Sequence, residues 1–480
     1  MLNGLQDKMS GKLEFLSEDD CEKIHYASLE VLSEVGLKIE PGYALDALEE
    51  MGCDVNKRTS IVKFPNYLVE ECLRACPHSV KLYGLDSKYD IKMEKKRTYV
   101  STGTGYGVID EKENLARAGN LNDVREATLI AHHLDNIHSI SPPLVGVSDS
   151  PANIATETIL AETLKNTNKT IEFYLTGTSD SKPEVDDLIS LCELVAGGAA
   201  ELKKRPFAML ALNPVSPLIY PEEQISSIFK CVDAGIPVAI MPGAVGGATA
   251  PITISGILTQ SNAEFLGGVV LANIVKKGAP VVYAHYNSIM NMQTGNYSAG
   301  SVEMGLIGSC VGQLGNWYGI PTNGFFPMSD SHIPDQQVGY EKMMQWVLST
   351  LGGMNYLNGA GSVENGTLIS LEQLVIDNEV VGMVDRMLKG VQVDDERIGI
   401  DTISKVGPGG NYFKQAHTLQ WSRDECFIPK ISEKESFSNW EGENVITKAK
   451  ATVDEMLRNV ETPVDKDIIK DIEQFQKELL

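Results

Sequence analysis

Between residues 98 and 360, eight short β-rich runs alternate with helical segments, and this alternation is the strongest constraint on the fold. The runs are residues 98–105, 137–144, 170–177, 207–214, 237–244, 279–287, 321–326 and 354–360. The stretches between them, such as PEVDDLISLCELVAGG, have a helical pattern. Because strand–helix alternation builds parallel sheets, the chain is predicted to be an α/β protein with a closed (β/α)8 TIM barrel. An open doubly wound sheet is the alternative.

The segments that flank the barrel are predicted to be mainly helical. Residues 17–36 form an amphipathic pattern, with Ser17 as N-cap and Gly36 as the stop, and a second helix is expected over residues 41–51. We therefore expect residues 1–97 to be an α-rich N-terminal extension and residues 98–429 to be the barrel. Residues 430–480 are expected to be a charged helical tail packed on the barrel.

Composition excludes several classes of function. The chain of 480 residues has a formal net charge of −24, so it lacks the basic surface that nucleic acids or anionic lipids attract. Its longest apolar run, residues 265–275, is far shorter than the roughly 20 residues that a membrane span needs. The eight cysteines are scattered without a C-x-x-C pair, which favours a cytoplasmic protein without a zinc site. The glycine-rich stretches lack the spacing of nucleotide-binding loops.

In a TIM barrel the chemistry takes place at the carboxyl ends of the strands, which here form the mouth. Side chains along a strand alternate between its two faces, and we assign the polar face of each run to the mouth. This predicts a lining of aromatic, amide and carboxylate groups. Its members are Tyr283, His285, Asn287, Glu172, Tyr174, Asn213, one of Phe325 and Phe326, and one of Asn355 and Asn358.

His332 follows the seventh run and is flanked by Asp330 and Asp335. Nearby carboxylates would raise its pKa as an acid–base group, and it could also donate to a substrate carboxylate. The alternative is that Asp330 or Ser331 caps a helix that begins near Pro334, with His332 simply exposed. A later histidine, His417, follows a glycine-rich turn that could fold over the mouth.

Aromatic rings and carboxylates without a cluster of lysines or arginines suit a cationic substrate. A quaternary ammonium gains about 0.5–2 kcal/mol for each aromatic face that it contacts. The competing interpretation is that these rings only fill the barrel.

Three stretches carry a resemblance to a known family: LSEDDCEKIHYASLEVLSEVGLKI, SDSHIPDQQVGYEK and GPGGNYFKQAHTLQWSRDECFIPKI. In this order along nearly the whole chain, they resemble the trimethylamine methyltransferase superfamily. The resemblance implies a TIM barrel that moves a methyl group from a methylated amine to the cob(I)alamin of a separate corrinoid protein. It implies no tightly bound cofactor or metal, and it favours a homo-oligomer.

The sequence departs from the trimethylamine enzymes because they carry pyrrolysine near the segment that matches SDSHIPDQQ, and here every residue is standard. It is therefore more similar to the non-pyrrolysine branch, whose substrates are quaternary amines such as glycine betaine, proline betaine and carnitine. The resemblance implies that such demethylations serve methanogenesis or acetogenesis. Phe325, Phe326 and Met328 would then pack around the methyl groups, Asp330 would face the cation and His332 would orient the tail. The carboxylate of a betaine could also meet His285, Asn213, Asn287 or the backbone amides of STGTGYG (101–107).

Two other functions remain open from sequence. A barrel lyase or aldolase would use a lysine at a strand end to form a Schiff base, but no lysine occurs in the eight runs. A non-catalytic betaine-binding protein would be expected to show a secretion signal and two similar lobes, and neither pattern is visible.

Overall fold

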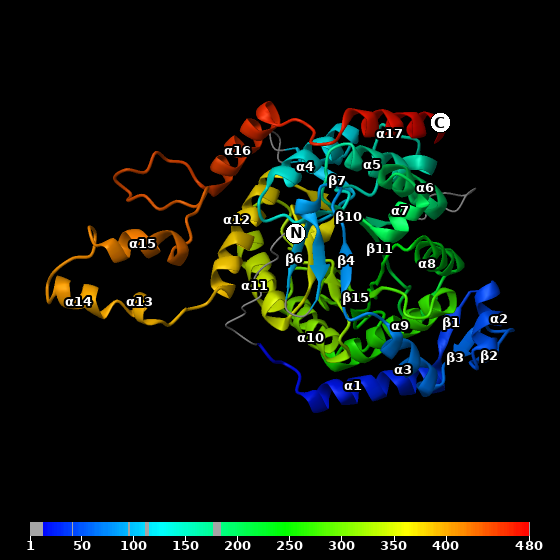
Figure 1. Cartoon of the computed structure of the whole chain (residues 1–480). Helices are drawn as coiled ribbons and strands as arrows, with labels where there is room; N and C mark the ends of the chain where they lie inside the picture. Colours follow the sequence, from blue (N-terminus) through cyan, green and yellow to red (C-terminus); the bar gives the residue numbers. More distant parts are fainter. Residues whose placement is uncertain (1–12, 41, 95–96, 111–114, 176–183, 480) are drawn as a thin grey trace.

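Eight parallel strands close into a barrel at the centre of the computed structural model, which describes residues 13–40, 42–94, 97–110, 115–175 and 184–479 (Figure 1). The ring closes because β6 pairs with both β9 and β19. In spatial order the strands are β10 (Thr170–Tyr174), β11 (Ala208–Leu212), β13 (Val238–Ile240), β15 (Val281–His285), β18 (Thr322–Gly324), β19 (Tyr356–Ala360), β6 (Tyr99–Thr102) and β9 (Ser139–Ile140). Each lies within one predicted run, so the predicted closed barrel is confirmed.

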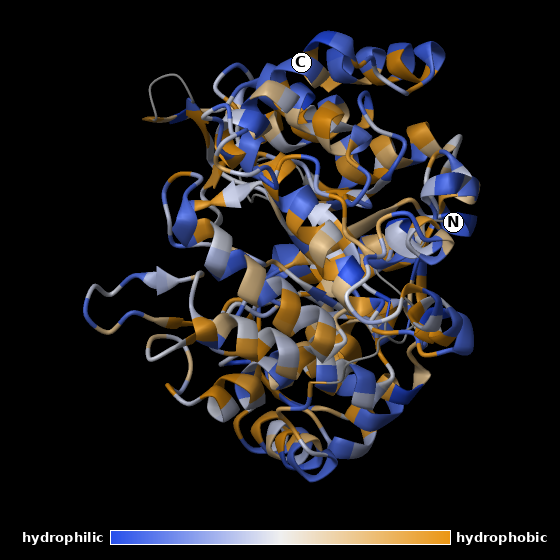
Figure 2. Ribbon diagram, turned by 90° about the vertical axis from the view of Figure 1, so that its left-hand side faces the viewer, coloured by the Kyte–Doolittle hydropathy of each residue, from blue (hydrophilic) through white to orange (hydrophobic). Residues whose placement is uncertain are grey.

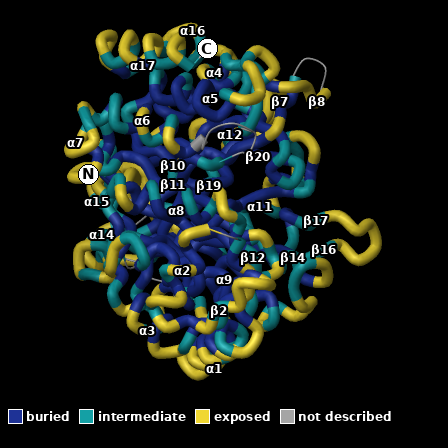
Figure 3. The backbone as a smooth tube through the Cα atoms, turned by 90° about the vertical axis from the view of Figure 1, so that its right-hand side faces the viewer, coloured by how far each residue is buried: buried dark blue, intermediate teal, exposed yellow. Residues whose placement is uncertain are grey.

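Helices that follow the barrel strands form the outer layer. They are α4 (Leu121–His133), α5 (Ala155–Leu164), α6 (Glu184–Ala196), α7 (Ala199–Lys204), α8 (Glu222–Ala234), α9 (Ile254–Val275), α10 (Val302–Tyr318), α11 (Gln336–Gly352) and α12 (Leu371–Leu388). The barrel strands are buried and the outer helices carry the exposed residues (Figure 3). Apolar residues accordingly concentrate in the interior, with polar residues on the outside (Figure 2). Within the described ranges, no helix has the length and hydropathy to cross a membrane.

The N-terminal segment contains strands as well as the expected helices. A capping box between Ser17 and Asp20 starts α1 (Glu18–Glu30), and a π-helical turn (Val31–Val35) ends it at Gly36. Three strands follow in a small sheet, of which β1 pairs with β12 (Ile219–Tyr220) of the barrel region and so fixes the segment to the side of the barrel. The remaining elements are β1 (Leu37–Ile39), α2 (Tyr43–Glu50), β2 (Asp54–Asn56), β3 (Ile61–Lys63), α3 (Asn66–Ala75), β4 (Val80–Leu82) and β5 (Ile91–Met93).

Two small sheets extend from the carboxyl ends of the barrel strands and build the walls of the mouth. One contains β14 (Val245–Gly246), β16 (Ser288–Met290) and β17 (Tyr297–Ser298). The other contains β20 (Ser362–Val363), β21 (Leu368–Ile369), β7 (Gly107–Asp110) and β8 (Leu115–Ala118).

After α12 the chain leaves the body and later returns (Figure 1). The projecting part carries α13 (Asp395–Ile398), α14 (Ile400–Val406) and α15 (Ala416–Glu425). The returning chain forms α16 (Val445–Asn459), which contacts α12 and α4, and α17 (Lys466–Leu479), which contacts α5 and α6.

Candidate active site

A buried carboxylate, that of Glu172 on β10, lies inside the barrel. It accepts hydrogen bonds from Tyr174 Oη at 2.7 Å and Ser141 Oγ at 3.2 Å. The side-chain amides of Asn323 on β18 and Asn358 on β19 also donate to it. Because donors from different barrel strands converge on this one group, Glu172 is the polar centre of the barrel interior.

The carboxylate of Glu172 has neutral donors but no positive partner. Burial raises the pKa of Glu172 above its ordinary value, although the hydrogen bonds from Tyr174, Asn358, Asn323 and Ser141 act in the opposite direction. Among the described residues, no lysine or arginine forms an ion pair with it. A buried carboxylate in this state would be stabilised by a cation brought in by a ligand.

Further oxygens inside the barrel are also without hydrogen-bond partners in the described part of the chain. These are the side-chain amide oxygens of Asn323 and Asn358, whose amide nitrogens donate to Glu172, and the hydroxyl of Thr104. All three side chains are buried. Since unpaired buried acceptors cost free energy, the two amide oxygens favour a ligand with positive or donor character, whereas the hydroxyl of Thr104 can either donate or accept.

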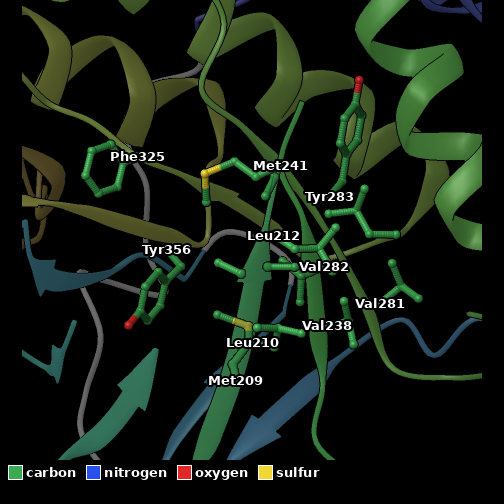
Figure 4. Close-up of a cluster of buried hydrophobic side chains, with 14 of the residues drawn as sticks. Met209, Leu210, Leu212, Val238, Met241, Val281, Val282, Tyr283, Phe325 and Tyr356 are labelled. Carbon is green, nitrogen blue, oxygen red and sulfur yellow. The ribbon is translucent and has the colours of Figure 1, made fainter. Parts of the chain in front are cut away.

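An aromatic cluster adjoins this polar centre. The ring of Phe325 meets Tyr174 edge-on at 5.9 Å and Tyr286 edge-on at 5.3 Å, between centroids. Tyr286 in turn packs on Tyr297 at 5.0 Å. Figure 4 places Phe325 on the same side of the strands as Met241. Aromatic rings beside a buried carboxylate form the combination that binds quaternary ammonium groups.

The predicted orientation of Tyr283 and His285 toward the mouth is wrong. Tyr283 stacks on Phe265 of α9, with centroids 4.0 Å apart and planes 11° apart, so it faces the outer helices (Figure 4). His285 has the same phase along β15 and packs on Phe326 at 4.7 Å. Burial lowers the pKa of His285 to about 3, so it is neutral and is no cationic partner for a carboxylate. The inward positions of β15 belong to the smaller Val282 and Ala284, which are in register with inward-facing neighbours.

The two adjacent phenylalanines after β18 have different environments. Phe325 belongs to the aromatic cluster, whereas the ring of Phe326 lies against Gly308 of α10, outside the barrel. Met328 is fully buried beside Gly366 and Phe325, near the aromatic cluster. The open choice between the phenylalanines is thus resolved in favour of Phe325.

Asp330 holds loops together. Its carboxylate accepts hydrogen bonds from Ser298 Oγ at 2.8 Å and from the backbone N–H of Gly300 at 2.7 Å. Both oxygens therefore join the loop after β17 to the loop after β18. The expectation that Asp330 faces a bound cation has no support in this geometry.

His332 is on the surface, with its side chain 75% exposed, and its Nδ1 lies 3.0 Å from Glu364 Oε1. Neither predicted carboxylate partner is beside it, because Asp330 binds the β17 loop and Asp335 caps α11 through the N–H of Val338 at 3.1 Å. The cap of this helix is thus Asp335, rather than Asp330 or Ser331.

Most of the other polar groups that were predicted to bind a betaine carboxylate already form hydrogen bonds within the protein. Asn287 accepts from the N–H of Ala244 at 2.8 Å through Oδ1, although its Nδ2 has no partner among the described residues. Asn213 is half-buried, and its carbonyl accepts from Gln224. In STGTGYG the amides of residues 103, 105, 106 and 107 all donate to backbone carbonyls. These amides are not available to a ligand.

Sequence reasoning missed several members of the site. Tyr286 alternates with Tyr283, His285 and Asn287, the residues of its run that are predicted to face the mouth, and Tyr297 lies outside the eight runs. Asn323 could have been found, because asparagine is unfavourable inside a strand and lies within PTNGFF. The choice between Asn355 and Asn358 is resolved, since Asn358 reaches Glu172 while Asn355 binds the backbone of Thr322.

In the part of the chain that the structure describes, no group of three or more His, Cys, Asp or Glu residues is arranged to hold a metal ion.

Comparison with known proteins gives matches along almost the whole chain. The family model described as "Trimethylamine methyltransferase (MTTB)" matches residues 4–478. The chain is 31% identical over 498 residues to a trimethylamine methyltransferase of Methanosarcina barkeri, with 98% of this chain and 95% of that protein covered. It is 28% identical over 441 residues to a glycine betaine methyltransferase of Desulfitobacterium hafniense (strain Y51), with 92% and 91% covered. The crystal structure of the Methanosarcina barkeri monomethylamine methyltransferase matches with 13% identity and a TM-score of 0.45, covering 98% and 95% of the two chains.

Proposed function

Because the chain belongs to the trimethylamine methyltransferase family, we propose that it transfers a methyl group from a quaternary amine to the cob(I)alamin of a separate corrinoid protein. Glycine betaine is the first candidate, since one relative of nearly equal length is a glycine betaine methyltransferase. Proline betaine and carnitine carry the same trimethyl- or dimethylammonium chemistry and are the next candidates.

The observation that carries this proposal is the buried Glu172 carboxylate beside the rings of Tyr174 and Phe325. A quaternary ammonium has no N–H to donate, so it is bound by charge and by aromatic faces. Each ring contributes about 0.5–2 kcal/mol, and the burial of Glu172 away from water strengthens its attraction for the cation.

The protonation chemistry favours a quaternary amine over trimethylamine. When the methyl C–N bond breaks, its electron pair stays on nitrogen and a quaternary amine departs as a neutral tertiary amine. No general acid is required. Trimethylamine can release a methyl group and depart as neutral dimethylamine only while its nitrogen carries a proton, so a site for it would have to keep that proton in place. The corrinoid supplies the nucleophile, and this chain has to bind the cation and orient one methyl group outward.

The roles of the individual residues follow from their positions. Glu172 holds the positive nitrogen, and Phe325, Tyr174 and Tyr286 limit the orientations of its methyl groups. The hydroxyl of Thr104 and the Nδ2 of Asn287, both without partners among the described residues, are the candidate donors for a carboxylate tail.

A Schiff-base lyase is disfavoured by the positions of the two most deeply buried lysines in the described ranges. Lys169 precedes β10, at the end of the barrel opposite the mouth, and its Nζ donates to the carbonyls of Ala131 at 2.8 Å and Leu134 at 3.1 Å. Lys342 on α11 pairs with Asp377 of α12, outside the barrel.

An anaerobic assay tests the proposal. The purified chain is supplied with a corrinoid protein charged with cob(I)alamin, or with free cob(I)alamin, and with glycine betaine, proline betaine, carnitine, tetramethylammonium or trimethylamine. We expect the absorption of methylated corrinoid to grow with a quaternary amine, with the demethylated amine formed in equal amount. Turnover of trimethylamine alone would contradict the proposal. Tight binding of a betaine without transfer to any corrinoid would instead indicate a binding protein.

A further inference from the structure

A turn of three residues, Glu364–Gly366, joins β20 to β21 in the wall of the mouth. All three residues have a left-handed backbone, with φ of 49° for Glu364, 57° for Asn365 and 77° for Gly366. Residues with a Cβ atom rarely adopt this conformation. It persists where the surrounding contacts enforce it, and such places are concentrated at functional sites.

Asn365, in the middle of the turn, forms hydrogen bonds with three other parts of the mouth. Its N–H donates to the carbonyl oxygen of Ser329 at 2.8 Å, in the segment after β18. Its Oδ1 accepts from the N–H of Ala299 at 3.1 Å, directly after β17. Its carbonyl oxygen accepts from Tyr286 Oη at 3.5 Å. One residue thus connects the loops after β17 and β18 with a ring of the aromatic cluster.

The residue after Asn365 packs on the same cluster. A Cβ atom placed on Gly366 would lie 2.6 Å from Met328 Cε and 3.3 Å from Phe325 Cε1, so the backbone of the turn rests directly on these two side chains. Both side chains are buried. The turn is therefore in contact with two rings of the cluster at once, with Phe325 through Gly366 and with Tyr286 through Asn365.

Asparagine combines the two properties that the middle of this turn requires. Among residues with a Cβ atom it is one of the few that enter the left-handed region readily, and its side chain carries an amide oxygen that accepts hydrogen bonds. Aspartate has both properties, whereas glycine has only the backbone freedom. The contribution of the Oδ1 bond can therefore be separated from that of the backbone conformation.

We propose that Asn365 is a positioning residue for methyl transfer, which holds Tyr286 and, through Gly366, Phe325 in the arrangement that orients the methyl groups of a bound quaternary ammonium. This inference rests on the proposed function, in which Glu172 attracts the cation and the rings orient it. Asn365 acts through the rings and leaves the charge of the site unchanged.

The rate of transfer should depend on Asn365 more strongly than the affinity does. Transfer requires one methyl group to point at the corrinoid, and a small misplacement of a bound reactant lowers the rate steeply. Binding needs only the charge of Glu172 and contact with the rings, which tolerate a range of orientations. Loss of Asn365 should therefore lower kcat with little change in the dissociation constant of the amine.

Kinetics and calorimetry of matched variants test this difference. Asn365→Gly keeps the left-handed backbone and removes Oδ1, so kcat with glycine betaine and a cob(I)alamin-loaded corrinoid protein should fall about tenfold. The dissociation constant of glycine betaine, measured without corrinoid, should change less than about threefold. Asn365→Asp keeps the acceptor and should restore most of kcat. The control is Asn56→Gly, which removes an equivalent acceptor for the N–H groups of Arg58 and Thr59 in the N-terminal segment and should change neither constant.

Fluorine NMR tests the placement of the ring without any turnover. The chain is labelled with 3-fluorotyrosine, and Tyr286→Phe identifies the signal of Tyr286. This signal should shift or broaden in Asn365→Gly and return in Asn365→Asp, while the signal of the exposed Tyr67 stays unchanged.

The outcomes separate this inference from the proposed function. An Asn365→Gly variant with the Tyr286 signal and kcat of the wild type would overturn the inference, and so would an equal loss of kcat and affinity. If the wild type transfers no methyl group to any corrinoid, the proposed function fails, and the placement of the ring by Asn365 then stands or falls on the Tyr286 signal alone.

Discussion

At the scale of single residues, the protonation of Glu172 is coupled to ligand binding. Burial raises the pKa of this carboxyl in the folded protein, so the folded state holds the proton more tightly than the unfolded chain. The stability that this proton contributes is fully present below the ordinary pKa and is lost as pH rises through the raised pKa. A quaternary ammonium does not titrate and prefers the ionised carboxylate. Its affinity should therefore rise with pH until Glu172 is ionised, and binding below that point should release a proton.

Calorimetric titration in two buffers of different ionisation enthalpy measures this proton release. The matched variant is Glu172→Gln, which keeps the shape and removes the charge. It should bind a quaternary amine about thirtyfold more weakly, close to 2 kcal/mol, with an affinity independent of pH. It should be at least as stable as the wild type at neutral pH, because a buried charge is removed. An unchanged affinity in the variant would show that Glu172 does not hold the cation.

At the scale of elements, the sequence predicts all eight barrel strands but not which face of each strand points inward. β-rich runs with helical segments between them are a strong signal for strands. In a barrel, however, both faces of a strand are buried, so the pattern of polar and apolar residues does not separate them. Glu172 and Tyr174 were assigned to the correct face because a carboxylate is rarely packed against helices. Tyr283 was assigned wrongly because its ring, stacked on Phe265, is buried among helices like an apolar residue.

Substitutions of Phe325 and Phe326 test which of these two side chains, just after β18, faces the barrel interior. Phe325→Leu keeps apolar volume but removes an aromatic face from the cluster around the mouth, so affinity for a quaternary amine should fall by about 1 kcal/mol, roughly fivefold. Phe326→Leu changes packing against α10 and should lower the free energy of unfolding by about 1 kcal/mol without changing that affinity. Titration and thermal unfolding of both variants give the comparison. Equal effects on affinity would mean that the two rings do not face different sides of the barrel.

At the scale of the whole molecule, the feature that the sequence does not predict is the path of residues 390–444, which project from the side of the barrel (Figure 1). Residues 390–444 have short helical patterns and an ordinary mixture of apolar and charged residues, as a segment packed on its own barrel would have. The apolar side chains are equally consistent with a core inside the chain and with a surface that another chain covers. Only the three-dimensional path, in which Glu425 and Lys430 of the returning chain contact α12 while the residues before them project, separates these two cases.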